Sequence, residues 1–164
     1  MAVRDDFAAG EVLSADDLND TFASKLDLAG GKILQIVRAT DSTDRSTTST
    51  SFVDASISVT ITPTKSTSAI LLLWSAFARF PSGAYLALQI TDSSNNAISG
   101  AEEFFIGSTT TINVSSFSHT LFAYATPATT AATTYKGRFR VSTGTGSLRN
   151  ATNTGQMFAI EVSA

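Results

Sequence analysis

Few side chains in this sequence have the type and spacing that enzyme chemistry requires. The single histidine, His119, would need a nucleophile and an orienting acid beside it to act as a general base. Glu102 and Glu103 are the only adjacent glutamates, and neighbouring residues of a strand point to opposite faces. Their carboxyl groups therefore do not face each other across a substrate, as glycoside hydrolysis requires. We expect the protein not to be an enzyme.

Metal-binding and phosphate-binding patterns are also weak. Asp41 and Asp44 carry the oxygen ligands that calcium prefers, but the spacing of an EF-hand loop is missing. Zinc would need more nitrogen or sulfur ligands than one histidine and no cysteine supply. The segment Gly144–Gly146 lacks the Lys and the Ser or Thr that follow in a phosphate-binding loop. We expect no metal and no cofactor.

One row of basic residues is more specific. In the stretch Tyr135–Ser142, the cations Lys136, Arg138 and Arg140 occupy every second position, so they share one face of a strand. One interpretation is an ordinary solvated face. The other is contact with an acidic partner, which would be the acidic N-terminal segment of a neighbouring copy, an acidic particle surface or an anionic glycan.

The composition favours strands and polar loops over helices. Of 164 residues, 43 % are hydrophobic and only 15 % are charged, and 24 Thr and 22 Ser are present. This length allows one domain with a substantial core. The net charge of −3 does not indicate a nucleic-acid partner. The longest apolar run, Ala69–Trp74, is too short to insert into a membrane.

From residue 31 onward the apolar residues recur at every second position, as in strands. Ser51–Thr62 alternates apolar and polar residues, and Pro63 is expected to end that strand. Ala69–Phe80 is apolar on both faces, so one face is expected to meet the core and the other a loop, the helix or a neighbouring subunit. Its residues assigned to a tight core or a subunit seam are Ile70, Leu71, Leu73, Trp74 and Phe77.

Eight or nine such strands predict a mainly β protein, an antiparallel, jelly-roll-like β-sandwich that spans residues 31–164. Two segments of low complexity, Asp41–Ser51 and Thr126–Thr134, are expected to be exposed loops.

Residues 1–30 are predicted to form a separate N-terminal arm with a short helix. Ser14 can cap a helix that we expect from about residue 15 to residue 26, and Gly30 and Gly31 would end the segment. A helix this short is marginal alone, so it packs either on its own domain or on a larger assembly. The arm holds seven acids against two basic residues, and Gly30 and Gly31 separate it from the body. Both features favour packing of the helix on a larger assembly.

The segment DDFAAGEVLSADDLNDTFASK, residues 5–25, resembles the N-terminal attachment segments of bacteriophage tail-fibre, minor tail and head-fibre proteins. In those proteins a phrase like F-x-x-G-E-V-L-[ST]-A-x-x-L-N precedes the displayed domain. Residues 32–37, 48–63 and 68–74 are similar to a jelly-roll-like module of phage fibres and decoration proteins. The residues that carry the N-terminal phrase are Phe7, Gly10, Glu11, Val12, Leu13, Ser14, Leu18 and Asn19.

The resemblance implies a non-enzymatic virion structural protein that is assembled in the host cytoplasm. Its partners would be its own copies, as a homotrimer, other virion proteins and, for a tail fibre or minor tail protein, a host-surface glycan. A capsid decoration or head-fibre protein that braces the shell is an alternative. A carbohydrate-binding module with Phe52 and Tyr85 as exposed aromatics is another. The expected virion-anchoring residues are Phe7, Val12, Leu13, Leu18, Phe22 and Leu26.

Overall fold

The structure is a computed structural model that describes residues 31–107 and 115–163. Those residues contain ten strands and no helix. The predicted N-terminal helix lies outside the described residues. The strands are β1 (Ile33–Asp41), β2 (Arg45–Thr47), β3 (Val53–Ile61), β4 (Ala69–Phe80), β5 (Tyr85–Asp92), β6 (Phe104–Gly107), β7 (Ser115–Ala125), β8 (Thr133–Val141), β9 (Gly146–Leu148) and β10 (Gly155–Val162).

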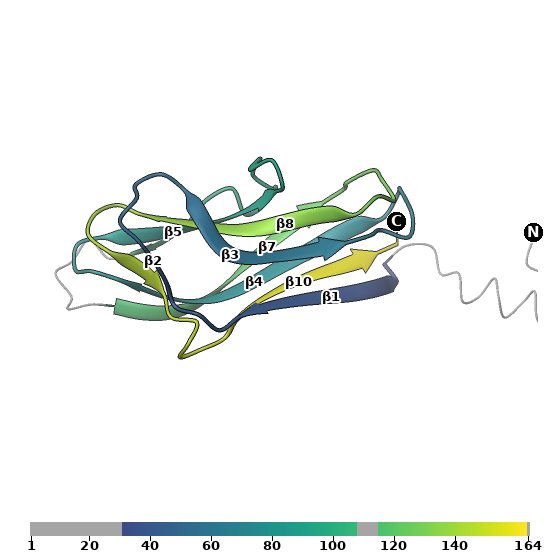
Figure 1. The fold of residues 1–164 in the computed structure, drawn as a ribbon. Helices are drawn as coiled ribbons and strands as arrows, with labels where there is room; N and C mark the ends of the chain where they lie inside the picture. Colours follow the sequence, from purple (N-terminus) through teal and green to yellow (C-terminus); the bar gives the residue numbers. More distant parts are fainter. Residues whose placement is uncertain (1–30, 108–114, 164) are drawn as a thin grey trace, which may run out of the picture.

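The strands form two antiparallel sheets, which confirms the prediction of a mainly β, antiparallel protein (Figure 1). Sheet A contains β1, β10, β4 and β7 in that order, and β9 and β2 continue it beside the far end of β4. Sheet B contains β3, β8, β5 and β6. In Figure 1, β3 and β8 of sheet B lie over β10 and β1 of sheet A.

The two sheets share one apolar core, which the alternation of their strands builds. In β3 the residues Ala55, Ile57, Val59 and Ile61 are buried and the residues between them are exposed, as the period of two predicts. The strand ends at Ile61, two residues before Pro63. The inward residues of β4 include Ile70, Leu72 and Trp74, whose exposed fractions are 1 % or less.

A glycine lets the sheets approach at the largest core side chain. Gly137 of β8 faces Trp74 of β4, and a Cβ atom at Gly137 would lie 2.9 Å from Cζ2 of Trp74. The same Cβ would lie 2.9 Å from Cγ2 of Ile57. No larger residue fits there unless the core moves.

The expectation of an exposed loop over Asp41–Ser51 holds only in part, because most of these residues are exposed but a short strand lies among them. This segment contains β2, which pairs with β9, and Asp41 is only 8 % exposed. Asp41 accepts hydrogen bonds from Arg45 and from the side chain of Asn150 at 2.9 Å each. The hydrogen bond from Arg45 is the main reason that the pKa of Asp41 is lowered. The segment is thus tied down by polar contacts that its composition does not reveal.

Candidate functional site

The predicted site residues fall into three groups in the structure. The expected virion-anchoring residues Phe7, Val12, Leu13, Leu18, Phe22 and Leu26 lie outside the described residues, so their role stays a prediction. The residues of Ala69–Phe80 lie on the two faces of β4. The cations Lys136, Arg138 and Arg140 lie on the outer face of sheet B.

The strand β4 divides its predicted core and seam residues between its two faces. Ile70 and Trp74 point into the core, whereas Leu71, Leu73 and Phe77 are half-buried and lie on the outer face of sheet A. Whether that outer face forms a subunit seam stays a prediction. Its neighbours on the adjacent strands decide what the face can contact.

The register of sheet A places apolar residues around Leu71 and Leu73. Leu71 lies between Ile160 of β10 and Tyr124 of β7, and Leu73 lies between Phe158 and Phe122 of the same two strands. Ile36 of β1 adds to the row of Leu71 because it pairs with Ile160. Together they form what we name the apolar outer face, made of Ile36, Leu71, Leu73, Phe122, Tyr124, Phe158 and Ile160.

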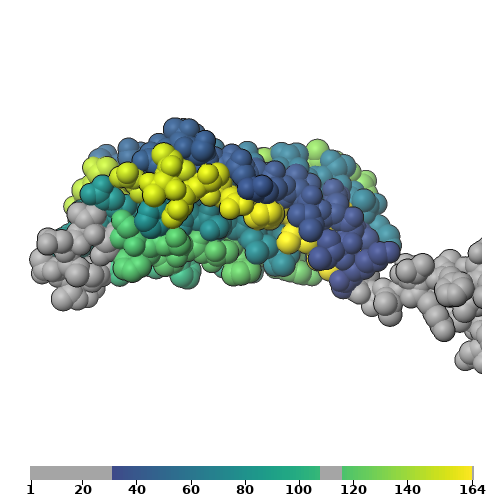
Figure 2. All heavy atoms as spheres, turned by 90° about the horizontal axis from the view of Figure 1, so that it is seen from below, coloured from purple at the N-terminus to yellow at the C-terminus, as the bar shows by residue number. Residues whose placement is uncertain are grey.

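Three side chains of the apolar outer face are strongly exposed, since Ile36, Phe122 and Tyr124 each retain 58 % of their accessible surface. Polar residues bound the face at one end, where the next row along the strands is Thr40, Gln156, Ser75 and Thr120. At the other end the next pair is apolar, Ile33 with Val162. Figure 2 views the molecule from below, where β1, β10, β4 and β7 run side by side in purple, yellow, teal and green.

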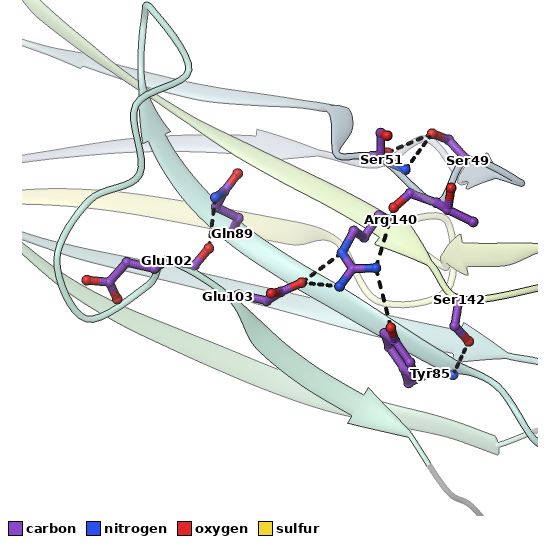
Figure 3. Close-up of polar contacts among 9 residues, drawn as sticks. Ser49, Ser51, Tyr85, Gln89, Glu102, Glu103, Arg140 and Ser142 are labelled. Atoms are coloured by element: carbon purple, nitrogen blue, oxygen red, sulfur yellow. Dashed lines mark hydrogen bonds and ion pairs between the residues drawn. The ribbon is translucent and has the colours of Figure 1, made fainter.

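On the outer face of sheet B, Arg140 of β8 gathers three aromatic rings. Its guanidinium carbon lies 5.4 Å from the ring centres of Phe52 and Tyr85 and 5.6 Å from that of Phe105. Its Nε donates a hydrogen bond of 2.7 Å to Glu103, with which it also forms an ion pair (Figure 3). These distances are those of cation–π contacts and a charge-assisted hydrogen bond.

Hydrogen bonds from two residues of β5 hold the segments around this cluster in place. The side-chain amide of Gln89 on β5 donates to the Glu102 carbonyl at 2.8 Å, and the Tyr85 amide donates to Ser142 Oγ at 3.0 Å (Figure 3). Burial alone would lower the pKa of Arg140, but the hydrogen bond to Glu103 helps to raise it. The guanidinium therefore stays charged and fixed in place.

The arrangement around Arg140 can stack a flat, weakly polar ligand. Phe105 is 54 % exposed and meets Tyr85 edge-on at 5.0 Å between ring centres. Exposed ring faces beside fixed polar groups are the features that a carbohydrate site uses. Sequence reasoning named Phe52 and Tyr85 for this role, considered Glu103 only for catalysis and missed Phe105. The spacing of two residues between Glu103 and Phe105 was the available signal, because in an extended segment it places both side chains on one face.

The other two predicted cations also have partners within the chain. Lys136 Nζ donates to Asn95 Oδ1 at 2.8 Å and to the Ser93 carbonyl at 3.1 Å. Arg138 Nη2 donates to the Phe52 carbonyl at 2.7 Å. Each of the three cations is therefore held in place, and contact with an acidic partner stays a prediction.

The residues first considered for catalysis are separated. Half-buried His119 lies 5.7 Å from the Phe104 ring centre and 6.2 Å from that of Phe117, and burial lowers its pKa. Glu102 accepts a hydrogen bond from the Gly100 amide, whereas Glu103 pairs with Arg140. The two glutamates thus point to different partners, as neighbouring residues in an extended segment should.

Within residues 31–107 and 115–163, no three His, Cys, Asp or Glu side chains gather as a metal site. The same residues contain no helix that is long and apolar enough to cross a membrane. Comparison with protein-family models and with the curated proteins finds no match for this chain.

Proposed function

We propose that this protein is a non-enzymatic structural protein of a bacteriophage virion, of the tail-fibre or minor tail type. Residues 1–30 attach it to the particle, and residues 31–164 are displayed outward as a homotrimer that contacts the host surface. It is located in the virion, which is assembled in the host cytoplasm. A capsid decoration or head-fibre protein that braces the shell is the alternative within the same class.

The fold that we propose for residues 31–164 is a jelly-roll-like β-sandwich. If the short strands β2 and β9 are set aside, sheet A holds the first, eighth, third and sixth strands of the chain and sheet B the second, seventh, fourth and fifth. This strand order supports a jelly-roll winding, an architecture of viral capsid domains. A fold alone does not identify a function. The observation that carries the proposal is this strand order behind an N-terminal segment that resembles phage attachment segments.

We expect antibodies against the protein to label phage particles purified from the lysate of cells that produce it. In electron micrographs, label at the tail supports a fibre or minor tail protein, and label over the shell supports decoration. If neither labelling nor mass spectrometry detects the intact protein in purified phage particles, both forms of the proposal are contradicted.

The predicted anchor gives the sharper version of this test. The double variant Leu18→Asp, Phe22→Asp places two charges on the apolar stripe of the predicted helix, and incorporation into particles is expected to fall at least about tenfold. The control Ser24→Asp changes the opposite side of that predicted helix and is expected to be incorporated normally. Equal incorporation of both variants would remove the anchor from the proposal.

A second candidate function, glycan binding, is favoured by the rings of Phe52, Tyr85 and Phe105 around Arg140. It suits a host-surface adhesin and also a carbohydrate-binding module of a cellular protein. The site offers an exposed ring, a fixed cation and the carboxylate of Glu103 on one sheet face.

We expect Phe105→Ala to weaken binding to glycans on an array at least about fivefold, since one lost ring contact is worth about 1 kcal/mol. The matched control is Phe104→Ala. Phe104 is 46 % exposed, but it lies on the other side of β6, next to His119. A wild-type protein that binds no glycan, or equal losses in both variants, would eliminate this candidate function.

A further inference from the structure

We propose that the apolar outer face of sheet A is the surface through which copies of this chain pack against one another. The inference deepens the proposed function, because it names the surface on which the proposed self-assembly depends. It rests on that function only for the choice of copies of the chain as the partner. The composition, orientation and extent of the face supply the argument.

The two outer faces of the molecule differ in composition. On the outer face of sheet B, β3 shows the exposed residues Asp54, Ser56, Ser58 and Thr60, as expected of a strand facing water. On the outer face of sheet A, two adjacent rows across β1, β10, β4 and β7 carry seven apolar residues and one charged residue, Arg38. The exposed side of β3 in sheet B therefore has the composition of a solvent-facing surface, whereas the outer face of sheet A has the composition of a buried one.

The orientation of β10 is the strongest single observation. This strand turns Gly155, Met157, Ala159 and Glu161 inward, and it turns its larger apolar residues Phe158 and Ile160 outward. A chain that had only one core to fill would gain more by burying the larger apolar side chains and exposing the glutamate. The outward placement of Phe158 and Ile160 indicates that the outer face also becomes buried.

The extent of the face suits a second copy. At the usual strand spacing and rise, two rows across four strands cover roughly 260 Å² in projection. The whole four-strand surface covers roughly 600 Å², close to the roughly 800 Å² that each partner contributes to a standard interface. Sheets also pack face to face in proteins.

Polar residues flank the apolar rows along one side, as at the rim of known interfaces. Arg38 lies on the edge strand β1 with its guanidinium 5.8 Å from the ring centre of Phe158. It can cover that ring while its charge stays in water at the rim. Thr40, Gln156, Ser75 and Thr120 form the polar border on the next row.

The test is the mass of the full chain in solution, measured by light scattering over a range of concentrations. The double variant Phe122→Glu, Tyr124→Glu changes two side chains that are each 58 % exposed, so the fold of one copy should tolerate it. The control Ser58→Glu, Thr60→Glu adds the same charge to exposed positions of sheet B. Circular dichroism and thermal melting of each variant establish that it is folded.

We expect the wild type and the control to form oligomers and the Phe122, Tyr124 variant to be a folded monomer, with self-association weakened at least about tenfold. A trimer agrees with the proposed function, and a dimer supports this surface while contradicting the trimer. A folded variant that associates like the wild type overturns the inference. A monomeric wild type also overturns it, whether residues 1–30 or a lipid surface covers the face. Particle labelling tests the virion proposal separately from mass.

Discussion

Replacing Trp74 by alanine is expected to lower the free energy of unfolding by about 3–5 kcal/mol. Trp74 is the largest of the fully buried side chains, with 1 % of its surface exposed, and its ring lies against Gly137 of the opposite sheet. Its loss removes a central contact between the sheets. Urea unfolding should be followed by circular dichroism, because the variant lacks the single tryptophan of the chain. The control Phe105→Ala, at an exposed ring, is expected to cost about 1 kcal/mol or less.

Gly137 allows a sharper form of this prediction. Alanine is normally better than glycine inside a strand, but here the added Cβ would meet Trp74 and Ile57 at 2.9 Å each. Gly137→Ala is therefore expected to destabilise the wild type by about 1–3 kcal/mol. In the Trp74→Ala background it should cost less than half as much, because the cavity accepts the methyl group. Equal costs in the two backgrounds would show that the Trp74 ring is not what disfavours a larger side chain at residue 137.

The strands with strict alternation were predictable from the sequence. In β3 the predicted apolar face is the buried face, and Pro63 follows the end of the strand. In β4 the doubly apolar pattern predicted cover on both sides, and the structure puts Ile70 and Trp74 in the core and Leu71 outside. These features follow from local side-chain periodicity, which a sequence displays directly.

The sites themselves depend on register between distant segments, which periodicity does not contain. Arg140 meets Phe52, Tyr85 and Phe105 only because β8 lies between β3 and β5 and β6 borders β5. The pattern of β10 is misleading for a different reason. By hydrophobicity alone its inward face would be the one with Phe158, whereas the structure uses the opposite face.

The second large effect is expected at Glu161, the fully buried carboxylate of β10. Its Oε1 accepts hydrogen bonds from the Thr64 amide at 2.7 Å and the Thr64 hydroxyl at 2.8 Å, and its Oε2 accepts one from Gln35 at 2.6 Å. It thereby ties the β3–β4 loop and β1 to the end of β10. Glu161→Ala removes the acceptor of these hydrogen bonds and is expected to cost about 2–4 kcal/mol in unfolding free energy.

The same contacts give Glu161 a pH-dependent effect on stability. Burial raises its pKa, but the hydrogen bonds that it accepts, that of Gln35 first, outweigh burial and lower the pKa from 4.5 to about 2. Because the folded state favours the carboxylate, its stabilisation is complete above pH 4.5 and is lost as the pH falls toward 2. Glu161→Gln removes this ionisation, so the stability difference between wild type and variant should shrink over that interval.

Urea unfolding of both proteins at several pH values between 7 and 2 measures this difference directly. The control Glu103→Gln removes the carboxylate of a partly exposed ion pair, with side chains 17 % and 33 % exposed, and is expected to cost less. A wild-type advantage over Glu161→Gln that is the same at pH 7 and pH 2 would mean that Glu161 stabilises through packing alone. A shrinking advantage would establish that Glu161 stabilises the fold through the hydrogen bonds of its ionised carboxylate.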